Sequence, residues 1–222
     1  MALASTMTKP SAAPVADVER TRERILQIAT QLFAADGFHT VSLRRLTQEA
    51  SVNLASVGYH FGSKEGLIAA IFARHCEPMM AHRRAMLLAC AEKRGRPPML
   101  EQIIEAFIVP AIAATEDNAD RATFTRLRAV LAHENNKLAH SIISKYFDAT
   151  STLFIEALHR FVPHLSREEV LWRFHFLLSA LYYTTVNPMR IQLLSHGKID
   201  PTDERKAIAE MVKFVAAGFR AK

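Results

Sequence analysis

The stretch SLRRLTQEASVNLASVGYHFGSK, from Ser42 to Lys64, predicts two short helices joined by a tight turn. Ser42 is a good N-cap for the first helix, because its hydroxyl can accept a hydrogen bond from a first-turn N–H. Apolar residues then follow on one face at helical spacing: Leu43, Leu46 and Ala50. Asn53 can cap the second helix, Leu54 to Phe61. Such a pair has the form of a helix-turn-helix, whose second helix lies in the major groove of DNA.

The residues around this stretch resemble the TetR family of bacterial transcriptional regulators, over Thr21 to Leu67. The markers of the resemblance are Arg24-Ile25-Leu26, Leu32-Phe33, Gly37-Phe38, Ser42-Leu43-Arg44, Tyr59-His60-Phe61 and Ser63-Lys64-Glu65. It implies an N-terminal three-helix DNA-binding domain and a C-terminal helical bundle for ligand binding and dimerisation. The alternative is a three-helix packing unit without a DNA role, but basic flanks favour DNA binding.

The composition agrees with an all-α protein that has an anionic partner. The chain has 222 residues, of which half are hydrophobic and only seven are glycine. Its net charge is +6 and its pI is about 9.5, which favours association with an anion without proving it. The two cysteines, Cys76 and Cys90, do not have metal-ligand spacing. We expect free thiols in a cytoplasmic protein, with a redox switch as the alternative.

The sequence predicts three regions. Residues 1–19 are rich in Ala, Ser, Thr and Pro and lack the pattern of a secretory signal, so we expect a disordered arm. Residues 20–66 form the expected helix-turn-helix domain, and residues 67–222 the ligand-binding and dimerisation domain. No stretch has the length and apolar character of a membrane span. We therefore expect no membrane partner, and neither a cofactor nor a metal site.

Helical periodicity and capping residues set the expected order of elements. The first helix begins near Val18 or Thr21 and ends at Asp36. The expected later helices run from Ser63 through Pro78 towards Lys93, then over 99–114, 119–134 and 138–161, from the capping box at Ser166, and from Asp200-Pro201 to about Arg220.

The second-last helix contains LWRFHFLLSALYYTTV, Leu171 to Val186, which is apolar nearly all round. Such a helix must be covered on more than one side. Together with the last helix it would expose a large apolar patch on a monomer, so we expect a homodimer. Similar proteins dimerise through their last two helices. The expected interface residues are Leu171, Leu178, Tyr182, Ile208, Met211, Val212, Val215 and Phe219.

The expected DNA-reading helix contains no Lys or Arg. Leu54, Ala55 and Ser56 lie where side chains meet base edges, and short apolar groups there contact thymine methyls. Tyr59, His60 and Lys64 match positions that hold phosphates in the family. Arg44, in the first helix of the pair, can reach a base or a phosphate, and Asn53 completes the expected DNA-binding set. The alternative for Tyr59 and His60 is packing beside Phe61. We expect the partner to be double-stranded DNA with a palindromic operator.

The body resembles the fatty-acid-responsive PsrA-like subgroup of the family. Short motifs carry this resemblance: Phe124-Thr125-Arg126-Leu127, Leu171-Trp172-Arg173-Phe174-His175-Phe176 and Ala216-Ala217-Gly218. It implies an apolar tunnel for a long-chain fatty acid or acyl thioester. The candidate lining residues are Phe107, Phe124, Leu127, Leu131, Phe147, Phe154, Trp172, Phe176 and Tyr183, and the candidates for the acid group are Arg126, Arg128, Arg173 and His175. The alternatives are plain core for the aromatics and surface or ion-paired roles for the cations.

Three partial matches to enzyme motifs are incomplete. His133-Glu134 is not followed by the second histidine of a zinc protease, and Gly62-Ser63-Lys64 has the wrong order for a phosphate loop. Ser195 and Lys198 have the spacing of a penicillin-binding serine enzyme without its partner motifs. The sequence therefore predicts a repressor released by a small hydrophobic effector. An activator, a ligand-independent DNA binder and a small-molecule carrier remain as alternatives.

Overall fold

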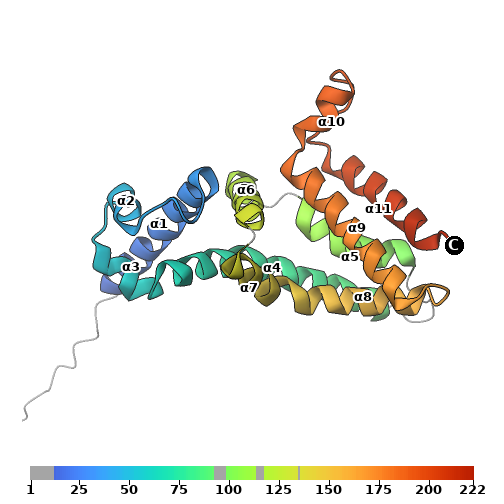
Figure 1. Cartoon of the computed structure of the whole chain (residues 1–222), viewed down its shortest axis with the longest axis horizontal. Coiled ribbons are helices and arrows are strands. Elements are labelled where there is room, and N and C mark those ends of the chain that lie inside the picture. The colour runs from blue at the N-terminus through green and yellow to red at the C-terminus, as the bar shows by residue number, and fades with distance from the viewer. Residues whose placement is uncertain (1–12, 93–98, 114–117, 135) are drawn as a thin grey trace, which may run out of the picture.

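The computed structural model describes residues 13–92, 99–113, 118–134 and 136–222, and every regular element in these ranges is a helix (Figure 1). The elements are α1 (Ala13–Asp36), α2 (Leu43–Glu49), α3 (Leu54–Phe61), α4 (Lys64–Glu92), α5 (Leu100–Ile112), α6 (Asn118–Glu134), α7 (Lys137–Ile143), the π-helix η1 (Ser144–Asp148), α8 (Ala149–Phe161), α9 (Arg167–Val186), α10 (Met189–Leu194) and α11 (Glu204–Arg220). This confirms the predicted all-α fold class. None of the described helices could cross a membrane.

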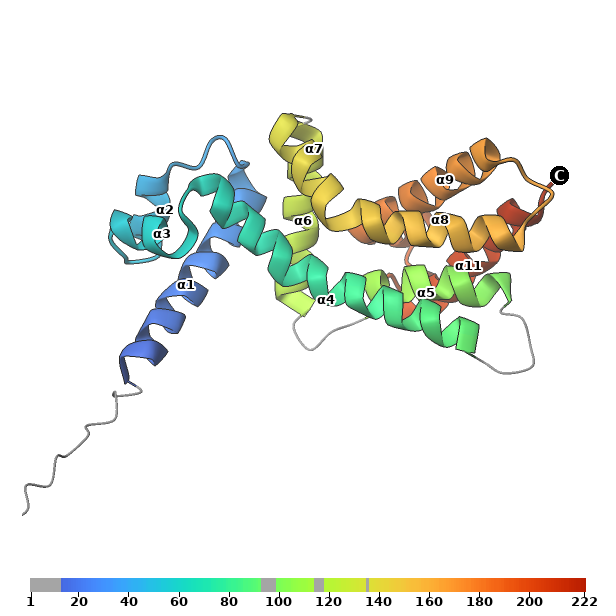
Figure 2. The same cartoon turned by 90° about the horizontal axis from the view of Figure 1, so that it is seen from below.

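The molecule has a small head and a larger body, connected by one long helix. Helices α1, α2 and α3 form the head, and α4 runs from the head into the body (Figures 1 and 2). Helix α6 packs against α1 and stands between the head and the body. One hydrophobic core joins the head to the first half of α4, α6 and α7, while a second core joins α5, α8, α9 and α11.

Four of the predicted helix caps are present. The Ser42 hydroxyl accepts the N–H of Arg45 at 3.1 Å, and the side-chain oxygen of Asn53 accepts the N–H of Ser56 at 2.8 Å. Ser63 caps α4 through the N–H of Gly66 at 3.0 Å. Ser166 begins α9 with the predicted capping box. These short-range bonds satisfy first-turn donors, which is why their positions were readable from sequence alone.

Gly66 has a steric reason to be glycine. A Cβ at this position would overlap the carbonyl oxygen of Phe61, which is backbone and cannot move aside. The end of α3 therefore lies directly against the first turn of α4. This close approach places the expected reading helix firmly on α4, the helix that enters the body.

Several element boundaries differ from those predicted. Helix α1 begins at Ala13, so residues 13–19 are helical rather than part of an arm; residues 1–12 lie outside the described part. The helix expected over 138–161 is divided by the π-helix, and α10 was not anticipated as a separate helix. The last helix begins at Glu204 with Asp203 as its cap, because Asp200 instead accepts the Thr202 N–H within the preceding turn.

Several residues predicted to form the dimer interface are buried within the monomer instead. Four of them on α11 are buried within the chain, where α11 packs on α5 and α9: Met211, Val212, Val215 and Phe219. Ile208 also packs against that core, and Tyr182 is half-buried. Leu171 and Leu178 are exposed, as expected for a face without a partner in the monomer. Packing on α5 determines which face of α11 is buried, and α9 and α11 as the dimer interface stay a prediction.

Candidate DNA-binding surface and effector pocket

Helix α3 presents an exposed surface at the end of the head. The side chain of Leu54 is 58% exposed and that of Tyr59 is 78% exposed, and Ala55 lies on the same solvent-facing side. Val57 is the buried residue of α3 and attaches the helix to the head core. Exposure of a large apolar side chain and an aromatic ring on so short a helix indicates a contact surface.

The first turn of α3 is rigidly capped. The Asn53 side-chain oxygen accepts both the backbone N–H and the hydroxyl of Ser56, at 2.8 and 2.9 Å. Both side chains are therefore already engaged in the monomer. We read them as positioning the reading helix, although each keeps further hydrogen-bonding capacity for a base or a phosphate.

The aromatic residues at the end of α3 form a short cluster. The His60 ring meets the Tyr59 ring edge-on, with centroids 5.0 Å apart, and lies 5.9 Å from the Phe61 ring. His60 is half-buried and Phe61 packs against the head core, whereas Tyr59 projects into solvent. The packing alternative thus describes His60 well, and Tyr59 is free to contact a partner.

Lys64 does not have the position that was expected for a phosphate ligand. Its ammonium donates to the carbonyl oxygen of Phe38 and lies 4.4 Å from the centroid of the Phe38 ring. Burial lowers the pKa of Lys64. Both contacts turn the cation towards the head interior, so in this conformation Lys64 connects the start of α4 to the loop after α1.

Arg44 is an exposed cation of α2, the helix that packs beside α3. Its neighbour Arg45 is bound to Asp36 at the end of α1, 2.8 Å away. Arg24 on α1 donates to the carbonyl oxygen of Ala50 in the turn of the helix-turn-helix, at 3.4 Å. The two arginines that brace the head are therefore distinct from Arg44, which keeps its side chain available for DNA.

Glu134, the last residue of α6, is a connection that the sequence analysis missed. Its carboxylate accepts the backbone N–H of Phe38 at 2.9 Å and lies 3.5 Å from the His39 ring. Asn136 contacts the same ring at 2.9 Å. The two partners are far apart in sequence and no motif connects them, so only the fold brings the body's α6 onto the head.

The predicted lining residues do not gather around one cavity. Phe124, Leu127 and Leu131 are buried on α6, and Phe147 packs with them, in the core shared with the head. Phe107 and Phe154 are buried in the other core, with ring centroids 4.9 Å apart. The predicted members on α9 lie on the outer surface: Trp172, His175, Phe176 and Tyr183. Helical spacing alone did not distinguish these three locations.

The three arginines expected to bind the acid group of the effector also lie in different places. Arg173 donates to the carbonyl oxygens of Gly218, Phe219 and Ala221 at 2.8, 3.2 and 2.8 Å, so it caps the end of α11. Arg126 is exposed beside a hollow of about 250 Å³ between α1 and α6. Of this set, Arg128 alone points into the interior, where its guanidinium lies 5.5 Å from the Tyr182 ring centroid.

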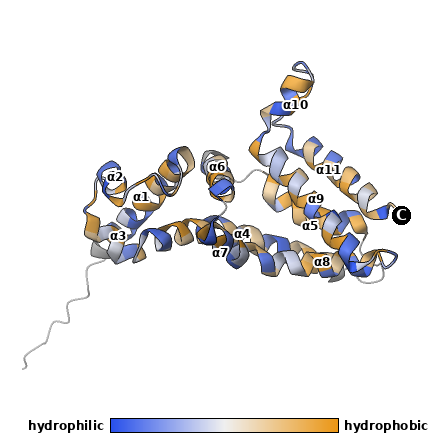
Figure 3. Cartoon of the chain, in the orientation of Figure 1, coloured by the Kyte–Doolittle hydropathy of each residue, from blue (hydrophilic) through white to orange (hydrophobic). Residues whose placement is uncertain are grey.

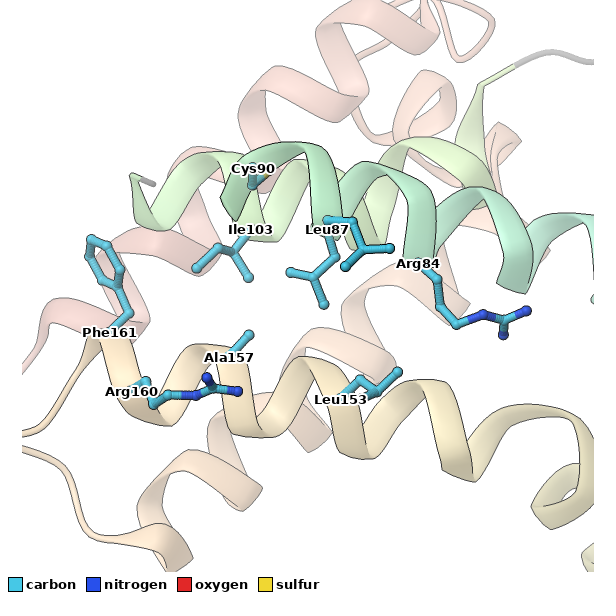
Figure 4. Close-up of a pocket in the computed structure, with 9 residues that line it drawn as sticks. Arg84, Leu87, Cys90, Ile103, Leu153, Ala157, Arg160 and Phe161 are labelled. Atoms are coloured by element: carbon cyan, nitrogen blue, oxygen red, sulfur yellow. The ribbon is translucent and has the colours of Figure 1, made fainter. Parts of the chain in front are cut away.

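An open pocket of about 540 Å³ lies between α4, α5 and α8. Its lining is mostly apolar and comprises Arg84, Leu87, Leu88, Cys90, Ile103, Leu153, Ala157, Arg160 and Phe161. Figure 4 shows Leu87 reaching from α4 towards Leu153 and Ala157 on α8, with Arg84 and Arg160 at the margins. Small-molecule sites commonly have this size and this combination of apolar walls and few charges.

Large apolar side chains are also exposed on α9 and α11, two helices that pack against each other and carry many hydrophobic residues (Figure 3). We call this exposed surface the α9–α11 face; its large apolar members are Leu171, Trp172, Phe176, Leu178, Tyr183 and Phe214. Trp172 and Phe176 stack with ring centroids 5.9 Å apart, and Phe214 is 69% exposed. Aromatic residues in such a patch are typical of the centre of a protein–protein interface.

Comparisons with known families match both parts of the chain. Residues 25–71 match the family described as bacterial regulatory proteins, tetR family, and residues 105–218 match the tetracyclin repressor-like C-terminal domain. The HTH-type transcriptional regulator UidR from Escherichia coli is 34% identical over 68 residues, which are 31% of this chain and 35% of UidR. The match thus spans about a third of that relative's length.

Solved structures extend the likeness of the fold over nearly the whole chain. The fatty acid degradation regulator FadR from Bacillus halodurans has a TM-score of 0.62 at 14% identity, covering 98% of this chain and 100% of that one. A transcriptional regulator from Aquifex aeolicus has a TM-score of 0.57 at 16% identity, covering 88% and 99%. At these identities the likeness concerns the fold alone.

Proposed function

The chain belongs to the TetR family of bacterial regulatory proteins, and from this premise we propose that it is a transcriptional repressor that binds operator DNA as a homodimer and releases it on binding a small hydrophobic effector. One observation carries the DNA-binding part. A capped helix at the tip of the head exposes Leu54, Ala55 and Tyr59, which none of the other described residues cover.

The reading helix contacts both bases and phosphates. Leu54 and Ala55 offer apolar contact to thymine methyls in the major groove, which is the type of contact that carries sequence information. Tyr59 on the same helix and Arg44 on α2 are placed to bind the sugar–phosphate backbone, which sets register and supplies affinity. Because α3 lacks Lys and Arg, specificity rests on apolar fit rather than on bidentate contacts to guanine.

A homodimer provides the second reading head. The α9–α11 face exposes a contiguous aromatic surface, which a two-fold related copy would cover with the same residues. Burying such a surface is favourable by roughly 25 cal/mol per Å² of apolar area. The two heads must lie about 34–36 Å apart, or a multiple of it, to enter successive major grooves on one side of the duplex.

We propose a long-chain fatty acid or acyl thioester as the effector, in the pocket between α4, α5 and α8. The pocket's apolar walls from Leu87, Ile103 and Leu153 suit a methylene chain, and each buried CH₂ contributes about 0.8 kcal/mol. The likeness in fold to a fatty acid degradation regulator agrees with this effector class. The resulting lining replaces the aromatic set expected from the sequence.

Effector binding reaches the head through α4 and α6. Helix α4 lines the pocket and continues to the reading helix, while α6 holds the head through Glu134 and Phe38. An effector that binds one body conformation more tightly than the other shifts the spacing of the two heads. The coupling is reciprocal, so operator DNA must lower the affinity for effector by the same factor.

A titration of the labelled operator complex tests this function. Saturated fatty acids from C8 to C18 are added while fluorescence anisotropy follows release of DNA. The proposal expects release at concentrations that fall with chain length until the pocket is filled. Leu153→Glu, which places a charge in the pocket wall, should abolish release without abolishing DNA binding. A response that ignores chain length contradicts the acyl effector, and DNA binding that no acid affects favours the ligand-independent alternative.

A further inference from the structure

Two arginines of the body, Arg83, which is buried, and Arg128, which is partly buried, have no carboxylate partner among the described residues. Arg83 on α4 is 3% exposed, and its Nε donates to the carbonyl oxygen of Phe107 at 2.8 Å. The Nε of Arg128 on α6 is inaccessible to solvent and has no hydrogen-bond partner. In the described part of the chain neither arginine forms an ion pair with a carboxylate; the neighbours that influence them are each other, Cys76 and Tyr182.

This arrangement is unfavourable in the ligand-free protein. A buried charge is normally paired, and a buried donor is normally hydrogen-bonded. Burial and repulsion from Arg128 lower the pKa of Arg83 to about 9, so Arg83 remains cationic at neutral pH. Burial also lowers the pKa of Arg128. The aromatic rings beside them, Phe107 at 3.8 Å and Tyr182 at 5.5 Å, stabilise the cations only in part. Perturbed, unpaired groups of this kind are typical of binding sites.

Arg83 lies next to the proposed pocket. Leu87 and Ile103 line the pocket, on α4 and α5 respectively. Arg83 precedes Leu87 by four residues, and Phe107 follows Ile103 by four residues, so each lies one helical turn away on the same face. The bond between Arg83 and Phe107 confirms that these turns face each other. The apolar wall therefore continues directly to Arg83, and Arg128 is near enough for its charge to lower the pKa of Arg83.

We propose that Arg83 and Arg128 form the receptor for the carboxylate of the effector, with the apolar part of the same molecule in the pocket between α4, α5 and α8. The two guanidiniums offer several N–H donors to one anion, a strong and geometrically selective arrangement. This inference rests on the proposed effector function and narrows the ligand class to amphipathic acids. Free acids are selected over neutral analogues of the same shape.

The position of Arg128 explains how an acid would signal. Arg128 and Glu134 lie on the same helix, six residues apart, and Glu134 holds the loop after α1 through Phe38. A carboxylate that draws Arg128 towards Arg83 acts on α6 between the body and the head. The charged end of the ligand is thus read at the helix that contacts the DNA-binding domain.

The test compares hexanoate with hexanamide, which match in shape and differ in charge. Thermal unfolding of the full-length protein is followed for wild type and for Arg128→Met, at equal ionic strength. We expect hexanoate to raise the unfolding temperature of wild type at about tenfold lower concentration than hexanamide. In Arg128→Met this difference should vanish. Equal responses of wild type to both compounds, or an acid preference that persists in Arg128→Met, would overturn the proposal.

Two further readouts make the result unambiguous. Without ligand, Arg128→Met should unfold at the same or a higher temperature than wild type, because it removes an unpaired buried charge; a clear decrease would identify Arg128 as a structural group and overturn the proposal. Arg128→Lys retains the charge and should keep a weaker acid preference. Failure of the regulator function appears separately, as absent operator binding or absent release by C8 to C18 acids, because the unfolding assay contains no DNA.

Discussion

The carboxylate of Glu134 at the end of α6 accepts the backbone N–H of Phe38 in the head, at 2.9 Å. Gly37, beside it, has a φ of +86°, and a Cβ there would come within 3.3 Å of the same carboxylate. The contact joins the body to the loop between α1 and the helix-turn-helix. Beside the continuous helix α4, it is a second link between the body and the head.

Glu134→Ala should uncouple effector binding from DNA release. The variant loses the acceptor for Phe38, so effector binding still stabilises the body but moves the head less. We expect release of labelled operator to require more effector or to remain incomplete, while the thermal shift caused by effector is unchanged. Glu134→Gln keeps an oxygen acceptor and serves as the matched control. A normal release curve for Glu134→Ala would show that coupling uses another route.

Arg44 and Lys64 should respond differently to alanine substitution. Arg44→Ala removes an exposed cation and should weaken binding on all sequences, lowering the salt slope by about 1 without altering stability. Lys64→Ala instead removes the contacts with Phe38 and should lower the unfolding free energy, by about 1 kcal/mol. Salt titrations of DNA affinity and urea unfolding separate the two effects. An unchanged unfolding free energy for Lys64→Ala would restore it as a phosphate ligand.

Phe176→Asp should produce folded monomers. Phe176 is 58% exposed and lies in the α9–α11 face, so the charge meets solvent in the monomer and a partner only in the dimer. Light scattering should show the monomer mass, with helical circular dichroism retained and operator binding lost. Val212→Asp is the contrasting variant: Val212 is 4% exposed, and an unpaired charge there should unfold the chain. A dimeric Phe176→Asp protein would place the interface elsewhere.

Cys76 should be unreactive in the native protein. It is fully buried, and burial raises the pKa of its thiol from 9.0 to about 12. Alkylation at pH 8 should label Cys76 only after unfolding, as read by mass spectrometry. Because the folded pKa is raised, the stability contribution is intact below pH 9 and falls as pH rises towards 12. From pH 8 to 10, wild type should lose about 1.4 kcal/mol relative to Cys76→Ala. Rapid native labelling would revive the redox-switch alternative.

The parts of the fold that depend on local sequence were predictable. Ser42, Asn53 and Ser166 cap helices through bonds to residues three positions away, and such bonds leave a readable pattern. The exposed reader at Leu54 and Tyr59 followed from the same motif. The periodicity of α9 showed that it needs cover on more than one side.

The parts that depend on which helices pack together were not predictable from one sequence. Apolar residues of α11 such as Val212 looked available for a partner until α5 covered them. Phe124 and Phe176 are both phenylalanines in apolar helical stretches, yet Phe124 is buried beside the head and Phe176 is exposed on α9. The burial of Arg83 could have been predicted from the sequence. Arg83 lies at helical spacing within the apolar series Met80, Leu87 and Cys90, on one face of α4.

The measurement that tests the central claim most directly is selection of bound DNA from a random duplex library by the full-length protein. The account predicts recovery of a palindrome whose half-site centres lie about 10 base pairs, or a multiple of that, apart. It also predicts that Tyr59→Ala and Leu54→Glu bind the recovered duplex much more weakly than wild type while remaining folded and dimeric. Recovery of no preferred sequence, or unchanged binding by both variants, would contradict α3 as the reading helix of a dimeric regulator.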